Sequence, residues 1–206
     1  MSKWIRRQMV PALCALGAAS GCGDFVRQGA SPSLATVTRL EAASGADPAR
    51  FGGTLSSDVI TYVKKTINGA EVRVPTLYSD PGRVTVSVEA RNPSLTSATP
   101  INSVTFTRYR VRFVRADGRN VPGVDVPFPF DSAVTFTVPP GNSNQAGFDL
   151  VRVISKSEAP LVSLAGNQDF LTMIAQVTFY GQDHAGNEVS ATGNIGVTFG
   201  NFGDPD

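Results

Sequence analysis

Histidine and cysteine, which often carry out chemistry in proteins, are scarce in this chain of 206 residues. The single histidine, His184, stands beside Asp183, so a serine–histidine–aspartate triad would have to use it. It lies among turn residues, where an imidazole faces water, and we interpret it as a turn residue. One histidine and two cysteines, Cys14 and Cys22, cannot supply the four His and Cys ligands of a structural zinc site. The sequence therefore predicts no catalytic residue and no set of metal ligands.

Carboxylates could hydrolyse glycosides as a pair or bind calcium through their oxygens. Five aspartates stand where a turn favours this residue for backbone reasons: Asp117, Asp125, Asp131, Asp183 and Asp204. They form no dense Asp-x-Asp-x-Asp series, so no catalytic pair is singled out, and a calcium site stays an open alternative. The sequence also lacks a phosphate loop, a nucleophile elbow and a dinucleotide fingerprint. We predict that the protein is not an enzyme and takes no cofactor.

Two local patterns are candidates for binding. Arg108, Arg110 and Arg112 lie on one side of a predicted strand, where they form either a solvated sheet face or a site for an anionic ligand. The segment Phe128-Pro-Phe130 cannot form a regular ladder because of its prolines. We expect this segment to wrap onto the core; the alternative is an exposed apolar loop.

The N-terminal segment has the pattern of an export signal. Three basic residues among the first seven precede an apolar stretch from Met9 to Ala19. This stretch is shorter than the about 20 residues that span a bilayer, but it suits a signal peptide. It ends in Ala19-Ser20-Gly21-Cys22, which resembles the bacterial lipobox. The resemblance implies cleavage before Cys22 and a lipid on its thiol; the alternative is an ordinary secretory signal.

This processing would divide the chain into a signal peptide (1–21), a lipidated tether (22–33) and a single domain (34–206). Removing 3 of the 18 basic residues leaves 15 against 17 acidic ones, a net charge of about −2. Such a balance gives no electrostatic case for binding nucleic acid. Gly23 occupies the position where aspartate favours inner-membrane retention in enteric lipoproteins, so we expect the outer membrane.

Sugar binding usually depends on aromatic faces. Trp4, the one tryptophan, would leave with the signal peptide. Tyr62, Tyr78 and Tyr109 would remain as possible stacking platforms.

Apolar and polar residues alternate through most of the chain, which is typical of half-buried strands. The predicted strands are residues 34–42, 58–63, 70–76, 84–90, 104–114, 134–138, 146–154, 171–179 and 189–199. Between Phe106 and Tyr109 the apolar phase switches, which indicates a β-bulge or a strand that passes between sheets. Predicted turns lie at 68–69, 80–82, 116–120 and 139–142, and a short helix is expected around 158–165.

The segment from Val177 to Ser190 resembles the final hairpin of bacterial immunoglobulin-like domains, with an aromatic strand, Asp-x-x-Gly-Asn and a strand rich in Ser and Thr. Asp183 is expected to cap the turn, while Gly186 and Asn187 tolerate a positive φ. Tyr180 could serve as a corner tyrosine that bonds to backbone. Together with the alternation, the resemblance implies an all-β fold, an antiparallel immunoglobulin-like β-sandwich of about 8–9 strands.

These patterns predict a membrane-anchored envelope lipoprotein with a non-catalytic structural or binding domain. The alternative is a carbohydrate- or ligand-binding accessory module. The expected partners are a membrane, through the lipid on Cys22, and an envelope protein or glycan.

Overall fold

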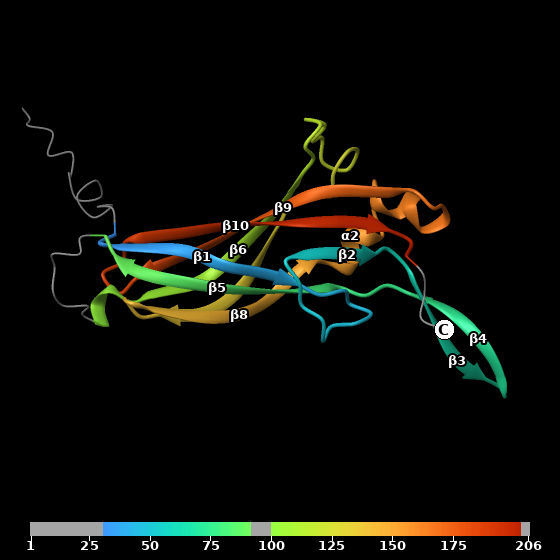
Figure 1. The fold of residues 1–206 in the computed structure, drawn as a ribbon, viewed down its shortest axis with the longest axis horizontal. Helices are drawn as coiled ribbons and strands as arrows, with labels where there is room; N and C mark the ends of the chain where they lie inside the picture. Colours follow the sequence, from blue (N-terminus) through green and yellow to red (C-terminus); the bar gives the residue numbers. More distant parts are fainter. Residues whose placement is uncertain (1–30, 92–99, 203–206) are drawn as a thin grey trace, which may run out of the picture.

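The computed structural model describes residues 31–91 and 100–202, and its fold is all-β, as predicted (Figure 1). The strands are β1 (Ser33–Ala42), β2 (Thr54–Asp58), β3 (Thr61–Ile67), β4 (Ala70–Thr76), β5 (Asp80–Ala90), β6 (Val104–Val114), β7 (Phe130–Val138), β8 (Asn142–Val151), β9 (Phe170–Asp183) and β10 (Glu188–Gly200). Three helical segments are short: η1 (Pro100–Asn102), α2 (Val153–Lys156) and η2 (Leu161–Gly166). Within the described ranges, no helix has the length and apolar character needed to cross a bilayer.

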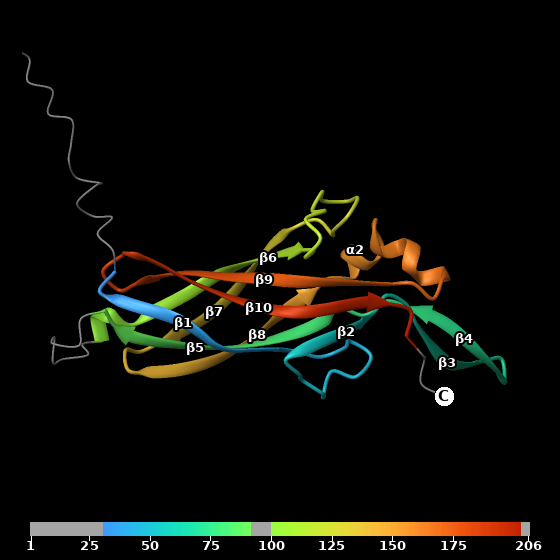
Figure 2. The same cartoon turned by 45° about the horizontal axis from the view of Figure 1, so that its top comes forward.

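The strands form two sheets that enclose the core, and a two-stranded ribbon extends from them (Figure 2). The larger sheet has the order β2-β10-β9-β6-β7. In this sheet β2 is parallel to β10, and the other neighbouring strands are antiparallel to each other. The smaller sheet has the order β1-β5-β8. Alternation explains the burial: Val84, Val86 and Val88 of β5 face the core, while the residues between them are partly exposed.

The phase switch in β6 is a β-bulge, as predicted. The register shifts between Phe106 and Arg108 in the ladders with both neighbours, β7 and β9. Thr107 and Arg108 are therefore both exposed, while Phe106 and Tyr109 on either side of them are buried. The second predicted alternative is wrong, because the whole strand stays in the larger sheet.

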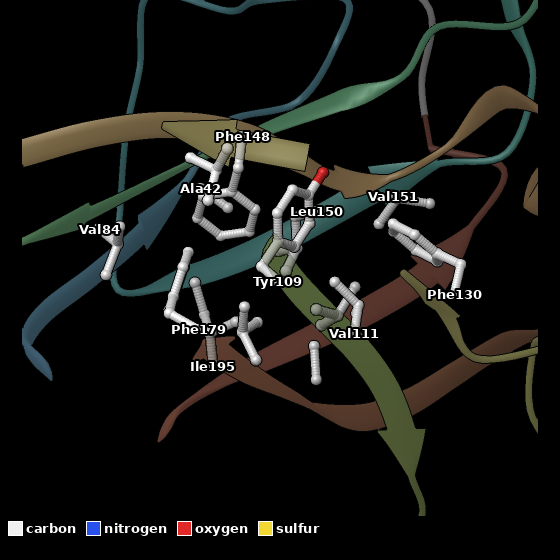
Figure 3. Packing of buried hydrophobic residues seen from close by; sticks show 14 of the residues in the cluster. Ala42, Val84, Tyr109, Val111, Phe130, Phe148, Leu150, Val151, Phe179 and Ile195 are labelled. Carbon is white, nitrogen blue, oxygen red and sulfur yellow. The ribbon is translucent and has the colours of Figure 1, made fainter. Parts of the chain in front are cut away.

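Tyr109 lies at the centre of the aromatic core and joins the two sheets (Figure 3). Its ring contacts Phe148 of β8 and Phe179 of β9, with centroid distances of 5.1 and 6.0 Å. Its hydroxyl donates to the carbonyl of Asp149 and accepts from the amide of the same residue, both at 3.1 Å. Tyr109 is thus a tyrosine that bonds to backbone, the role predicted for Tyr180.

Several predicted boundaries are wrong for local reasons. The predicted strand 58–63 spans a break, because β2 ends at Asp58 and β3 begins at Thr61. Residues 80–82 form no turn but begin β5, where Asp80 is buried and the register shifts at Pro81. The predicted strand 146–154 ends at Val151 because α2 follows it.

The turn at 116–120 is present, with φ of 82° at Gly118, but β7 begins only at Phe130. The connection between β6 and β7 is therefore longer than a hairpin turn. The helix expected around 158–165 is the 3₁₀ segment η2, which follows the separate short α-helix α2. By contrast, Asn68 and Gly69 close β3 and β4 as predicted, both with positive φ.

The turn between β9 and β10 depends on glycine at position 186. Gly186 has φ of 85°, whereas Asn187, predicted to tolerate such an angle, is not among the residues with positive φ. A Cβ at Gly186 would meet no atom within 4 Å, so a substitution costs only backbone strain. We expect Gly186→Ala to lower the free energy of unfolding by about 1 kcal/mol.

Chemical denaturation would measure this cost, with Gly53→Ala as the control. Gly53 also has free space around it, but it lacks a positive φ, so its replacement should leave the stability nearly unchanged. Equal stabilities for the two variants would contradict the left-handed conformation at Gly186.

Candidate functional site

The candidate catalytic residues lie apart from one another in the fold. His184 is exposed at the β9–β10 turn, and its backbone amide donates to the carbonyl of Ile101 at 3.2 Å. The Asp183 carboxylate beside it accepts hydrogen bonds from the amides of Ala185 and Asn187 and from the Asn187 side chain. These contacts make Asp183 the cap of the turn, as predicted, rather than the acid of a triad.

Asp183 also holds the beginning of the described chain. The hydroxyl of Ser31 donates to its second oxygen at 2.8 Å. Burial alone would raise the pKa of Asp183, but the hydrogen bonds from Asn187, Ser31 and Ala185 outweigh this effect and hold the pKa below its usual range. The side chain therefore carries its negative charge at neutral pH and fastens residue 31 to the C-terminal hairpin.

The other aspartates that were expected in turns each make their own local contacts. Asp117 accepts from Arg115 and Arg119, and the Arg115 guanidinium holds the pKa of this carboxyl well below its usual range. Asp125 accepts from the amide of Val121 at 3.1 Å. Over residues 31–91 and 100–202, no three His, Cys, Asp or Glu side chains gather in a way that could hold a metal ion. Asp204 and Cys22 lie outside the described residues.

The outer face of the larger sheet is the candidate binding site. Arg108, Arg110 and Arg112 of β6 point outward and are exposed. Asp131 on the neighbouring strand β7 bonds to Arg108 at 2.9 Å and lies 3.6 Å from Arg110. Arg112 lies further along the strand from this carboxylate, so the cationic stripe is only partly neutralised.

The strands beside the arginines contribute polar groups. Each arginine lies opposite a residue of β9, which in turn lies opposite a residue of β10: Arg108, Tyr180 and Ser190; Arg110, Thr178 and Thr192; Arg112, Gln176 and Asn194. The hydroxyls of Thr178 and Thr192 are 2.9 Å apart. This arrangement offers hydroxyl, amide and guanidinium groups on one open surface.

A hollow of about 770 Å³ opens at the bulged end of this face. Its lining includes Thr107, Arg108, Tyr180, Gln182 and Ser190. Gly181 permits the close approach of β9 to the bulge, because a Cβ there would lie 2.4 Å from the carbonyl oxygen of Thr105. The hollow could hold part of an extended polar ligand that continues along the arginine stripe.

Tyrosine stacking on a sugar has little support in this structure. Tyr109 is buried, so it is excluded as a platform. Tyr180 has the Arg108 guanidinium 4.2 Å from its ring centre, and this contact covers one ring face. Tyr62 and Tyr78 are partly buried.

The two phenylalanines of the segment 128–130 differ: one is buried, as expected for a segment that wraps onto the core, and the other is exposed. Phe130 begins β7 and is buried in the core, with the Arg152 guanidinium 3.9 Å from its ring centre. Phe128 is 52% exposed, so the prediction that the whole segment wraps onto the core is wrong for this residue. Its ring lies against Gly123, where a Cβ would be 2.4 Å from it.

Sequence patterns missed a buried ion pair between Asp80 and Lys156. Their side chains are 0% and 1% exposed, and Lys156 Nζ lies 3.0 Å from the carboxylate. The ammonium also donates to the carbonyl of Asp58, and Asp80 accepts from Ser57 and from the amide of Gly45. Burial raises the pKa of Asp80, although Lys156 and Ser57 oppose this rise. The pair is enclosed and fully bonded, so we assign it a role in stability.

Comparisons of the chain with protein-family models, with curated proteins and with solved structures found no match.

Proposed function

We propose that the chain is a lipid-anchored protein of the bacterial envelope, with a signal peptide in residues 1–21, a lipid on Cys22 and a non-catalytic binding domain. The observation that carries this proposal is the lipobox-like sequence Ala19-Ser20-Gly21-Cys22. The contacts of residues 31–33 support it, because they fix the point at which a tether would reach the domain. Ser31 bonds to Asp183 at 2.8 Å, and Ser33 bonds to the carbonyl of Asn102 at the same distance. A tether that joins the domain here would be attached to residues that are held in place at one end of the sheets.

An immunoglobulin-like sandwich is our proposal for the fold family. In such domains, strands A, B and E share one sheet, while G, F, C and C′ are neighbours in the other. The order β1-β5-β8 corresponds to A, B and E, and β10-β9-β6-β7 corresponds to G, F, C and C′. The capped turn at Asp183 supports the same assignment. Under this scheme, the β3–β4 ribbon is an insertion between strands A and B.

Replacing Cys22 tests the anchor. Cys22→Ser removes the thiol that would carry the lipid, so labelling with a radioactive fatty acid should be lost and the protein should leave the membrane fraction. Cys14→Ser is the matched control, because Cys14 would be removed with the signal peptide, and this variant should label like the wild type. Cys22→Ser protein that still pellets with washed membranes would contradict the proposal. Separation of inner and outer membranes would test the expected outer-membrane location.

The arginine stripe favours a second candidate, an accessory module that binds an anionic glycan. Alternate residues of a strand are roughly 7 Å apart on one face. Arg108, Arg110 and Arg112 therefore present a row of cations, and the amides and hydroxyls of β9 and β10 lie beside them. The charge of the processed chain is about −2 overall, so the stripe is a local concentration of positive charge.

Binding to polygalacturonate, with neutral dextran as comparison, would test this candidate. Arg110→Gln/Arg112→Gln should weaken binding of the anionic polymer by at least about tenfold, since each charged hydrogen bond contributes about 1.5–3 kcal/mol. Arg108 is left in place because it packs on Tyr180. The control Arg39→Gln/Arg50→Gln removes the same charge elsewhere. Equal affinities for the two double variants would contradict the glycan site.

A further inference from the structure

The β3–β4 ribbon extends from the body of the protein at the end opposite the start of β1 (Figures 1 and 2). Among the strands that the structure describes, β3 and β4 pair only with each other. An isolated two-stranded ribbon is marginally stable in water, because it has no third strand or helix to cover one face. The ribbon therefore gains stability from any surface that covers it.

The two faces of the ribbon differ in chemistry. Residues directly opposite each other share a face, and on one face these pairs are Val63 with Val74, Lys65 with Val72, and Ile67 with Ala70. On the other face the pairs are Tyr62 with Pro75, Lys64 with Arg73, and Thr66 with Glu71. The first face is thus mostly aliphatic, with Lys65 as its one charged residue, and the second is polar, with Lys64 and Arg73 as its basic residues.

The aliphatic residues at the tip are exposed. Ile67, next to the turn at Asn68 and Gly69, is 49% exposed, and Val72 is 41% exposed. Lys64 and Lys65 are also exposed and lie two to three residues back from Ile67. At about 3.4 Å per residue, these cations are set back from the apolar tip by roughly 7–10 Å.

The charge of the ribbon favours an anionic occupant. The formal charges of residues 61–76 sum to +2, from Lys64, Lys65, Arg73 and Glu71, and Lys65 is the cation that lies nearest the tip. A second copy of the ribbon would bring the same positive charge, so self-association is opposed. The set-back matches a bilayer interface, where an apolar tip enters by about 5–10 Å and cations meet the phosphates.

We propose that the tip of the β3–β4 ribbon docks on the surface of an anionic lipid bilayer. Ile67 and Val72 enter the boundary between headgroups and acyl chains, while Lys64 and Lys65 contact lipid phosphates. The inference rests on the proposed function in one respect: the lipid anchor at Cys22 is what brings the chain to a membrane. The ribbon then provides a second contact, either with the anchoring membrane or with one that faces it.

An environment-sensitive dye on the full chain would test this docking. The processed, acylated protein has no free thiol, so Ala70→Cys introduces one labelling site beside the exposed tip. The protein is reconstituted into phosphatidylcholine vesicles with or without phosphatidylglycerol. We expect a blue shift and quenching by brominated lipid in the anionic vesicles, at least about threefold greater than in the neutral ones.

Charge reversal on the ribbon gives the decisive comparison. A cation near an anionic surface strengthens association about fivefold, so Lys64→Glu/Lys65→Glu should reduce the inserted fraction at least about tenfold. The ribbon should stay folded, because Glu at position 64 faces Arg73 across the strands. The control Arg39→Glu/Arg50→Glu makes the same change in net charge on other parts of the surface and should keep the signal.

The outcomes separate the ribbon from the anchor. Protein that floats with anionic vesicles but shows no blue shift at residue 70, even after further anionic vesicles are added, would overturn the ribbon proposal. Protein that does not float and takes a second dye at Cys22 would overturn the anchor, and adding this unanchored chain to anionic vesicles would then test the ribbon directly. A blue shift that requires an added acidic protein would also overturn docking on lipid.

Discussion

Replacing Lys156 by methionine is expected to destabilise the folded protein by about 3–5 kcal/mol at neutral pH. Methionine is similar in length but offers no positive charge, so Asp80 would remain fully buried without its cation. Ser57 and the Gly45 amide still bond to Asp80, but they cannot neutralise its charge. Urea denaturation followed by far-ultraviolet circular dichroism measures the loss, and a change below about 1 kcal/mol would show that water reaches the pair.

The double variant Asp80→Asn/Lys156→Met distinguishes a lost charge from lost packing. Removing both charges of a buried pair often leaves the stability of the protein nearly unchanged, because the cost of taking the charges out of water disappears as well. We expect the double variant to recover at least half of the stability lost by Lys156→Met. No recovery would mean that the shape of Lys156, rather than its charge, is what the site requires.

The destabilisation by Lys156→Met should also depend on pH. The folded pKa of Asp80 is already raised by burial, and loss of Lys156 raises it further. A carboxyl with a raised folded pKa binds its proton more tightly in the folded state than in the unfolded state. The contribution of this group to stability is therefore most favourable at low pH, and it falls as the pH rises above the unfolded pKa. The difference in the free energy of unfolding between the variant and the wild type should therefore be smaller near pH 4 and larger near pH 7.

Phe179→Ala should cost about 3–5 kcal/mol, the usual loss when a fully buried phenylalanine is truncated. Phe179 is completely buried, and its ring meets Tyr109, Phe136 and Phe148 at centroid distances of 5.3–6.2 Å. Its removal would leave a cavity between the two sheets. Thermal and chemical unfolding would both report the loss, and a melting temperature equal to that of the wild type would contradict a core position.

Two controls on the same hairpin sharpen this comparison. Phe170 is also on β9 but is 71% exposed, so Phe170→Ala should change stability by less than about 0.5 kcal/mol. His184→Ala should be equally silent, because the imidazole is exposed at the turn. His184 is the one imidazole that a catalytic scheme could use, so loss of an activity in a stable His184→Ala protein would overturn the non-catalytic proposal.

Features that depend on a few neighbouring residues could be predicted from the sequence. Alternation at period two located most of the strands, since successive side chains of a strand point to opposite faces. The shift of apolar phase between Phe106 and Tyr109 located the bulge, because both residues must reach one core. The Asp183–Asn187 turn followed from side-chain capping and from the freedom of Gly186 to take a positive φ.

Contacts between residues far apart in the sequence could not be predicted, because they depend on how the strands pair and pack. Asp80 has the local pattern of a turn residue, and only the approach of α2, 76 positions along the chain, makes it half of an ion pair. The cationic stripe acquired its setting in the same way, because Tyr180 and Asp131 belong to the two strands that flank β6. The ribbon follows this rule too: its strands have ordinary alternation, and the order of the sheets leaves both of its faces outside the core. Local patterns set backbone conformation, whereas the pairing of strands decides which side chains lose contact with water.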